Sequence, residues 1–367
     1  MNQVYRLAFP KIKGIGPVYG RQVLDLFDDD LEAFFSASKK ELLQIPGITE
    51  HTVSSIKDKL LLEEAEKELA FVEKHQIQSL FFTDVDYPTR LLHCPDAPLL
   101  LFYKGSVALN QPRVVSIVGT RNATAYGQEL CAALVAGLKE YGALVISGLA
   151  YGIDSHAHRA CLQYGLPTIG VLGHGLDRIY PMQHRRLAMD MLDNGGLLTE
   201  YRSNTNPDRQ NFPARNRIIA GLADVVVVVE AALKGGALIT AEIANGYNRD
   251  VCAFPGKVGD AYSAGCNHLI KTHRAHLISG VKDLAYIMNW ATAEHVQSAH
   301  GQQLAMHLDL NDKEKPIYQL IQQQEKISID ELCLQLQVPQ SKISITLLEM
   351  EMKGLLVALP GKMYRVP

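Results

Sequence analysis

Short runs of apolar residues alternate with amphipathic stretches through the middle of the chain. Apolar runs with the length of a strand lie at residues 114–120, 143–148, 167–173, 195–201, 223–231, 250–256 and 275–279. Val225 to Val229 is an unbroken β-branched run, which is typical of a strand buried on both faces of a parallel sheet. Helical patterns such as 124–140 separate these runs. The alternation predicts an α/β fold: a Rossmann-like, doubly wound, mostly parallel sheet over residues 111–290.

The segment before this sheet, residues 1–110, has a helical pattern. Residues 13–24 and 45–56 repeat an apolar–Gly–apolar hairpin that is followed by an amphipathic helix. The repeat predicts a helix-hairpin-helix (SAM-like) pair. Such hairpins contact DNA phosphates through backbone N–H groups in some proteins and only pack helices in others. The acidic balance of this segment favours packing.

The segment after the sheet divides into a linker and a small domain. Residues 291–309 are polar and predict a linker. Residues 310–367 predict a helix, a second helix, a turn, a third helix and a hairpin through Pro360-Gly361, which is the order of a winged helix. Its third helix balances Lys342 and Lys353 against two glutamates, which favours an accessory or protein-binding role over duplex recognition.

Charge distinguishes the middle segment from the rest of a chain whose net charge is −3. Residues 112–290 carry 17 basic and 14 acidic side chains, and 12 of the basic ones are Arg, which binds phosphate in a bidentate geometry. No apolar run approaches the roughly 18 residues of a membrane span, so we expect no membrane partner. Six scattered cysteines without a Cys-x-x-Cys pair favour a reduced, cytoplasmic setting.

Small and basic residues gather where the predicted strands end. Gly119, Thr120 and Arg121 follow the first strand, Gly148 follows the second, and a Gly235-Gly236 pair follows the fifth. Sheets of this kind bind ligands beyond the carboxyl ends of their strands. Glycines there let the backbone approach a ligand, and the helices that follow offer N–H groups to anions. Several such turns along one edge suit a polymer of phosphates.

Common enzyme and metal motifs are missing. The chain has no G-x-x-x-x-G-K-[ST] loop, and its first strand ends in GTRNATAYG instead of G-x-G-x-x-G. His156 and His158 are two residues apart on a predicted helix and therefore point to different faces, which makes a poor chelate. We therefore expect no cofactor and no metal.

Successive blocks of the middle segment resemble the DNA-processing protein A (DprA/Smf) family. The blocks are SIVGTRNATAYG, VISGLAYGIDSHAHRACL, TIGVLGHGLDRIYP, NFPARNRIIAGLADVVVVVEA and GGALITAEIA. The resemblance implies a non-enzymatic single-stranded DNA-binding protein of natural transformation (competence). It further implies that the protein protects incoming DNA, helps load the RecA recombinase for homologous recombination, and acts as a homodimer.

The same resemblance assigns individual site residues. The family's DNA-binding arginine corresponds to Arg121, and a family asparagine to Asn267. Arg185 follows the Tyr180-Pro181 element, near which the family carries a basic residue. The family pocket corresponds to Gly119, Gly148, Arg215, Asn216, Gly235, Gly236 and Thr240.

Two other functions remain open at this point. Residues 235–242, GGALITAE, also resemble the GGxGTxxE motif of phosphoribohydrolases, in which Glu242 would be catalytic and Arg121 would hold a phosphate. A sensor of a nucleotide-derived ligand is the third possibility. If the protein binds DNA, we expect residues 112–290 alone to retain most of the affinity. We also expect Arg159, on a helix and not at a strand end, to lie outside the site.

Overall fold

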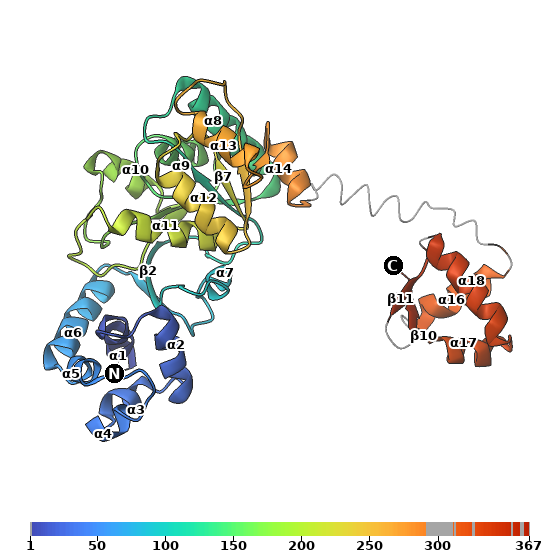
Figure 1. The fold of residues 1–367 in the computed structure, drawn as a ribbon, viewed down its shortest axis with the longest axis horizontal. Coiled ribbons are helices and arrows are strands. Elements are labelled where there is room, and N and C mark those ends of the chain that lie inside the picture. The colour runs from blue at the N-terminus through green and yellow to red at the C-terminus, as the bar shows by residue number, and fades with distance from the viewer. Residues whose placement is uncertain are drawn as a thin grey trace. The chain divides into compact units, whose positions relative to one another are not determined.

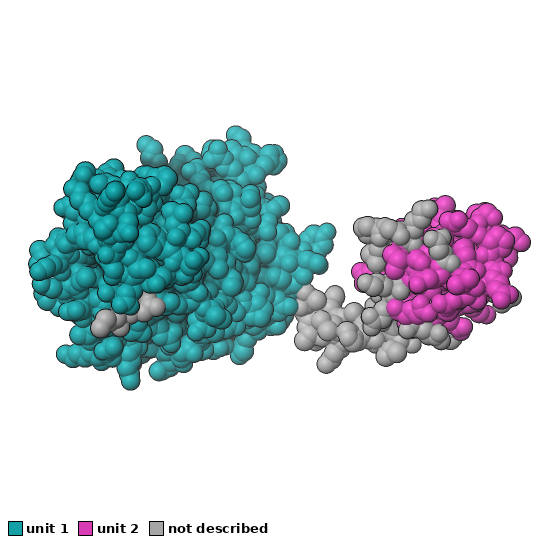
Figure 2. Space-filling view, turned by 90° about the horizontal axis from the view of Figure 1, so that it is seen from below, with its two compact units in different colours: residues 1–293 teal, residues 294–367 magenta. Residues whose placement is uncertain are grey.

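The structure, a computed structural model, describes residues 2–290, 311, 313–324, 327–353, 355–359 and 363–366. The chain divides into two compact units, residues 1–293 and 294–367, which are coloured separately in Figure 2. The predicted linker over 291–309 lies outside the described residues. No helix of the described part is both long and apolar enough to cross a membrane.

The first unit begins with a cluster of short helices, drawn in blue in Figure 1. Gly14 and Gly47 occupy matching hairpin positions with φ of +91° and +90°, a conformation that favours glycine. Helices α2 and α5 follow these two hairpins, which confirms the predicted tandem. The helices are α1 (Asn2–Ala8), η1 (Phe9–Lys11), α2 (Pro17–Leu26), α3 (Leu31–Ser36), α4 (Lys39–Leu42), α5 (Glu50–Ile56) and α6 (Lys59–Lys74).

A nine-stranded sheet forms the centre of the first unit. Its order is β1-β2-β6-β5-β4-β3-β7-β8-β9, and every neighbouring pair from β6 to β9 is parallel. The predicted α/β class and all seven predicted strands are confirmed. The strands are β1 (Gln78–Phe81), β2 (Leu100–Gly105), β3 (Val114–Val118), β4 (Leu144–Ser147), β5 (Thr168–Val171), β6 (Gly195–Thr199), β7 (Val225–Val228), β8 (Asp250–Ala253) and β9 (His276–Leu277).

Strands β1 and β2 correct the helical prediction for residues 1–110. β2 pairs antiparallel with β6, and β1 pairs antiparallel with β2. Leu100 to Tyr103 are buried because one face of β2 packs on the N-terminal helices and the other face packs in the core beside α7 and α11. The sheet therefore includes strands from residues 78–105, which lie before the range of 111–290 that we predicted for the sheet.

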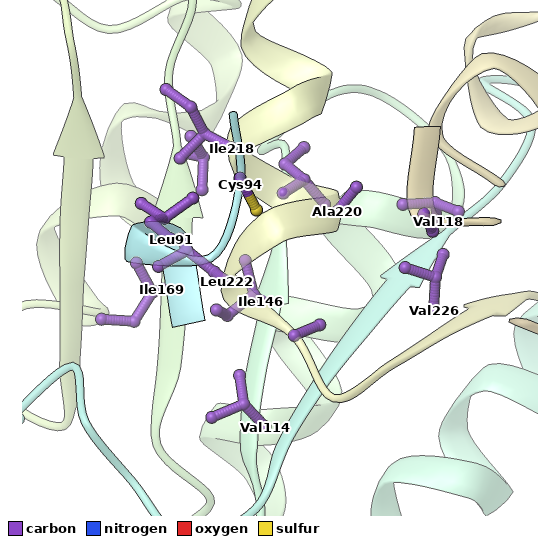
Figure 3. Packing of buried hydrophobic residues seen from close by; sticks show 14 of the residues in the cluster. Leu91, Cys94, Val114, Val118, Ile146, Ile169, Ile218, Ala220, Leu222 and Val226 are labelled. Atoms are coloured by element: carbon purple, nitrogen blue, oxygen red, sulfur yellow. The ribbon is translucent and has the colours of Figure 1, made fainter. Parts of the chain in front are cut away.

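Helices cover both faces of the sheet, as a doubly wound fold requires. One face packs against α7, α11, α12 and α13, and Figure 3 shows Leu91, Ile218 and Val226 in that layer. The other face packs against α8, α9 and α14. The helices are α7 (Thr89–Leu92), α8 (Ala125–Leu138), η2 (Lys139–Tyr141), α9 (Ile153–Tyr164), η3 (Met182–His184), α10 (Arg185–Asp190), α11 (Asn211–Leu222), α12 (Gly236–Gly246), α13 (Ala264–Lys271) and α14 (Val281–Ile287).

The second unit has the predicted winged-helix order. Its apolar core comes from all three helices and includes Ile321, Leu332 and Leu347. The hairpin turn at Pro360-Gly361 lies outside the described residues. The elements are α16 (Glu314–Gln324), β10 (Ile327–Ser328), α17 (Ile329–Leu336), α18 (Gln340–Met352), β11 (Val357–Leu359) and β12 (Met363–Arg365), with strand order β10-β12-β11.

Candidate nucleic-acid interface

The sheet reverses its direction of winding at the neighbouring strands β3 and β7. From β3 the chain proceeds through β4, β5 and β6 on one side and then returns to β7 on the other. The helices that follow β3 and β7, α8 and α12, lie on opposite faces of the sheet, and such a reversal is where open α/β sheets bind ligands. Gly119, Thr120 and Arg121 lie here, directly after β3.

Arg121 is exposed at this reversal point and has no carboxylate partner among the described residues. Its guanidinium carbon lies 6.0 Å from the centre of the Phe212 ring. Other arginines of the sheet domain are neutralised: Arg217 pairs with Glu200, and Arg274 pairs with Glu242 at 2.9 Å. Arg121 therefore retains its full positive charge for a ligand.

The N-terminus of α8, which follows Arg121, is already occupied by a protein anion. Glu230 is buried after β7, and its carboxylate accepts hydrogen bonds from Thr124 N at 2.9 Å and Thr124 Oγ1 at 2.5 Å. The Thr124 hydroxyl in turn caps Gly127 N at 3.2 Å. The expectation that the helix after β3 offers its first N–H groups to an anionic ligand is therefore wrong for Thr124 and Gly127, because these amides already have partners within the protein.

Helix α9 approaches the β3 loop closely, and Gly152 makes this approach possible. Gly152 has a φ of +75°, and a Cβ atom built there would lie 2.1 Å from Thr120 O. Ile153 N donates to the same carbonyl at 3.1 Å. The first turns of α9 are thereby held beside Arg121.

A cavity of about 760 Å³ opens between the β3 loop, α9 and η3. Its charged members are arginines, and no Asp or Glu is among the described residues that line it. Burial, followed by the charge of Arg159, lowers the pKa of His156, so this histidine is neutral at pH 7. The larger side chains that line the cavity include Arg121, Tyr151, His156, Arg159, Gln183 and His184.

Arg159 lies in this cavity, which corrects the expectation that it is outside the site. It is exposed, and Nη1 makes one long hydrogen bond, 3.4 Å to Ser155 Oγ. It lies on the second turn of α9, and the close approach at Gly152 turns that helix face toward Arg121. The sequence placed Arg159 on a helix correctly but gave no information on where that helix begins relative to the β3 loop.

Arg215 lies beneath the surface, in contrast to Arg121. Its Nη1 donates to the Gly148 carbonyl at 2.7 Å and also to the Val171 carbonyl. Desolvation lowers the pKa of Arg215 to about 10, against the opposing charge of Asp154, so the guanidinium is still charged at neutral pH. Arg215 is 4% exposed, so it supports the turns after β4 and β5 and does not reach a ligand at the surface.

The remaining predicted residues fall into separate places along the same edge. Thr240 Oγ1 and Asn216 Nδ2 both donate to Gly236 O, at 3.0 and 3.3 Å, beside the exposed Gly235. Asn267 pins the loop after β8, since it donates to Gly256 O at 2.9 Å and accepts from Gly256 N at 3.1 Å.

Three more of the predicted residues complete the placement. Arg185 is exposed at the start of α10, directly after His184 of the cavity. Gly119 packs against Ile153 so closely that a Cβ atom there would lie 2.4 Å from its side chain. Gly148 is equally tight, at 2.4 Å from Arg215 Nη1. These two glycines therefore allow close packing at the edge of the sheet.

The carboxyl edge of the sheet does not support the enzyme alternative or a metal site. Glu242, the carboxylate of the enzyme alternative, is exposed on α12 and pairs with Arg274 at 2.9 Å. It lines neither the cavity beside Arg121 nor a cavity that lies between Thr124 and Ser263. Within the described residues there is no group of three His, Cys, Asp or Glu side chains that could hold a metal ion.

Three family models match successive parts of the chain. The model described as DNA recombination-mediator protein A matches residues 78–289. A SAM-like helix-hairpin-helix tandem matches residues 8–60, and a DprA winged helix domain matches residues 306–362. The first model begins at β1, in agreement with the inclusion of β1 and β2 in the sheet.

Characterised relatives and solved structures give the same result. Protein Smf from Synechocystis sp. is 33% identical over an alignment that covers 99% of this chain and 98% of the relative. DNA processing protein DprA from Streptococcus pneumoniae is 44% identical over 58% of this chain and 75% of its own length. The X-ray structure of the S. pneumoniae protein covers 78% of this chain and 97% of its own, at 32% identity and a TM-score of 0.61. A Helicobacter pylori structure, named for the single-stranded DNA binding mode of its DNA processing protein A, covers 58% of this chain and 95% of its own, at 29% identity and a TM-score of 0.53.

Proposed function

The chain belongs to the DNA-processing protein A (DprA/Smf) family, and from this premise we propose that it binds single-stranded DNA along the carboxyl edge of its sheet. The observation that carries the proposal is the pair of exposed arginines, Arg121 and Arg159, which share one cavity without a carboxylate partner. Two uncompensated guanidiniums at a ligand-binding edge attract phosphate. Arg185 adds a third exposed cation beside them.

Single strands should bind more tightly than duplexes at this edge. The cations lie in a cavity and around short loops, which a flexible phosphate chain follows better than a stiff helix does. The test is a pair of anisotropy titrations with single- and double-stranded DNA of equal length at one fixed salt concentration. Equal affinities would contradict the proposal.

We propose the family's biological role for this chain as well. The protein would protect incoming single strands in the cytoplasm during natural transformation and help load the RecA recombinase on them. The test is RecA filament formation on DNA that is first coated with a single-strand-binding protein. Filaments should form faster when this protein is added, and an unchanged rate would reject the loading role.

A homodimer is the proposed working form. Strand β9 is an edge strand of two residues, and Leu277 on it is 52% exposed. Exposed sheet edges are natural sites of association between chains. Light scattering coupled to size exclusion should report twice the chain mass of 40.5 kDa, and a mass of one chain across micromolar concentrations would reject the dimer.

We further propose that the protein is not an enzyme. A phosphoribohydrolase needs its catalytic carboxylate next to the bound nucleotide, whereas Glu242 is paired with Arg274 and lines neither the cavity beside Arg121 nor the cavity between Thr124 and Ser263. Incubation with nucleoside monophosphates tests this directly. Release of free base, lost in a Glu242→Gln variant, would overturn the proposal and favour the enzyme.

A further inference from the structure

Another cavity, of about 440 Å³, lies where the N-terminal helices meet the loop after β6. Lys11 and Lys13 line it from the helical side, and Arg202 lines it from the sheet side. Both lysines are exposed, and neither has a salt-bridge partner within the described residues. Partial desolvation, followed by the charge of Arg202, lowers the pKa of Lys11 against weaker opposing effects from three glutamates. Three cations are therefore held close together at this junction.

The carboxylates that line this junction cavity already have partners. Asp58 caps α6 and accepts a hydrogen bond from Leu60 N at 3.0 Å. Glu64 lies 3.9 Å from Arg202 Nη1, and its side chain is 67% exposed. Arg202 itself is buried, and its Nε has no hydrogen-bond partner within the described residues. The two lysines are thus left for an anion from outside the chain.

Lys13 opens the first of the two N-terminal hairpins, and this hairpin is open where the second is covered. The amides of Gly14 and Gly16 donate no hydrogen bond within the described residues. A Cβ atom built at Gly16 would meet nothing within 4 Å, whereas one built at Gly47 of the second hairpin would lie 3.1 Å from the Tyr19 ring. Free backbone amides beside a lysine suit a phosphate.

The first hairpin is held in place on the carboxyl edge of the sheet. Arg202 Nη2, after β6, donates to the Leu7 carbonyl of α1. Glu68 on α6 accepts from Ser203 N at 2.9 Å and from Ser203 Oγ at 2.5 Å. These contacts join the helical cluster to the β6 loop on both sides of the junction cavity.

The junction cavity and the cavity beside Arg121 lie along one edge. Asn204 N, after β6, donates to Asp177 Oδ1, after β5, at 2.9 Å. Further along the same β5 loop, His184 lines the cavity beside Arg121. Strands β3 and β6 are three strand spacings apart, roughly 14 Å, which is about four nucleotides at a stacked spacing of about 3.4 Å. One single strand is therefore long enough to reach both places.

We propose that the bound single strand continues from the cavity beside Arg121 over the loops after β5 and β6 to this junction, where Lys11 and Lys13 contact one of its phosphates. The inference rests on the proposed single-strand function and deepens it, because it adds the N-terminal helices to the DNA-binding surface. It also makes affinity depend on length, since a strand too short to cross the loops gains nothing from the junction.

The test titrates the full chain with oligothymidylates of about four and about sixteen nucleotides. In Lys11→Ala/Lys13→Ala, long-strand affinity should fall about three- to tenfold, between the effect of an exposed ion pair and that of a charge-assisted contact. The salt slope should fall by up to about one. Short-strand affinity should equal that of wild type, whereas Arg121→Ala should weaken both lengths. Melting by circular dichroism should not change, because both lysines are exposed.

A matched control removes two lysines elsewhere in the same helical cluster. Lys39→Ala/Lys40→Ala acts on α4, where Lys39 already pairs with Glu50 at 2.6 Å. It should bind both strands like wild type. If it weakens long-strand binding as much as Lys11→Ala/Lys13→Ala does, net charge governs the effect and the junction site is wrong.

Other outcomes separate the junction site from the function on which it rests. Unchanged long-strand affinity in Lys11→Ala/Lys13→Ala, or an equal loss with both lengths, contradicts the site while single-strand binding stands. If a duplex of the longer length loses as much affinity as the single strand, the hairpin is a duplex site and the inference is wrong. If wild type binds neither strand, the proposed function itself fails.

Discussion

Arg121 and Arg215 have the same side chain in opposite environments. Arg121 is exposed and unpaired at the end of β3, whereas Arg215 is buried with its Nη1 on two backbone carbonyls. The sequence places both next to glycine-rich turns and cannot tell them apart, because the face of α11 that packs inward is decided by the sheet. Burial separates their proposed roles: contact with DNA for Arg121 and support of the turns for Arg215.

Arg121→Ala should weaken single-strand binding about ten- to a hundredfold and leave the fold intact. A charge-assisted contact is worth about 1.5–3 kcal/mol, and one lost phosphate contact lowers the salt slope by about one. Anisotropy titrations across salt concentrations measure both quantities. Arg159 cannot serve as the control, since it lines the same cavity.

Arg274→Ala is a better matched control. It removes the same charge from an exposed arginine that already pairs with Glu242. We expect it to bind single strands within about twofold of wild type, because a neutralised surface arginine contributes little to an anionic ligand. Equal losses in Arg121→Ala and Arg274→Ala would mean that net charge, and not this site, governs binding.

His158 makes the stability of the protein depend on pH. Burial first, and then the charges of His184 and two arginines, lowers its pKa to about 3, while an unfolded histidine titrates near 6.5. The unfolded chain therefore takes up a proton between these values and the folded chain does not. The contribution of neutral His158 is complete above pH 6.5 and is lost progressively as the pH falls toward 3.

Urea unfolding at pH 7 and pH 5 measures this contribution. Wild type should lose unfolding free energy between the two values. His158→Asn keeps a polar group near Thr168 Oγ1, which is 2.7 Å from His158 Nδ1, and removes the titration. Its stability should change less with pH than that of wild type; an identical slope in both proteins would show that His158 is not responsible.

At the scale of elements, the chain was predictable where one pattern dominated. Val225 to Val228 forms β7, because an unbroken run of valines is stable in few environments other than a strand buried on both faces. We did not predict β1 and β2 as strands, because their sequences, QSLF and LLFYKG, are short and follow a strongly helical region. The strand that joins β2 to the parallel sheet, β6, lies about 90 residues later, so no local pattern shows the pairing.

The pairing of β2 with β6 changes the expected behaviour of fragments. A fragment of residues 112–290 lacks β1 and β2 and exposes the β6 edge, which is buried in the whole chain. It also loses core side chains such as Tyr87 and Leu101. We now expect this fragment to aggregate or fold poorly, in contrast to the sequence-based expectation.

A fragment of residues 76–290 should fold and bind single-stranded DNA, because it keeps all nine strands and the cavity. Circular dichroism melting followed by titration compares the two fragments. A cooperative melt and near-full affinity for residues 112–290 would show that β1 and β2 are dispensable.

At the scale of the whole molecule, the proposed binding site lies within one of the two units. The cavity and all the predicted site residues belong to the unit of residues 1–293. The winged-helix unit has its own core, and its α18 exposes Ile345, Leu348 and Met352 in place of a basic face. Duplex readers carry positive charge on this helix.

Removal of the winged-helix unit should therefore leave single-strand affinity within about threefold of the full chain. A helix without excess positive charge contributes little to phosphate binding. The measurement is an anisotropy titration of residues 1–293 beside the full chain at the same salt concentration. A loss of tenfold or more would assign the second unit a direct part in holding DNA.

The long-range pairing of β2 with β6 also bears on how the protein is made. β2 ends at Gly105, and β6 begins at Gly195. At roughly 5–20 residues per second of translation, the hydrophobic β2 segment waits about 5–20 seconds for its partner to be synthesised. Until then the nascent chain exposes an apolar strand whose only available partner is β1. The nascent chain therefore has a period of vulnerability to misassociation early in its synthesis, when chaperone contact would be of most use.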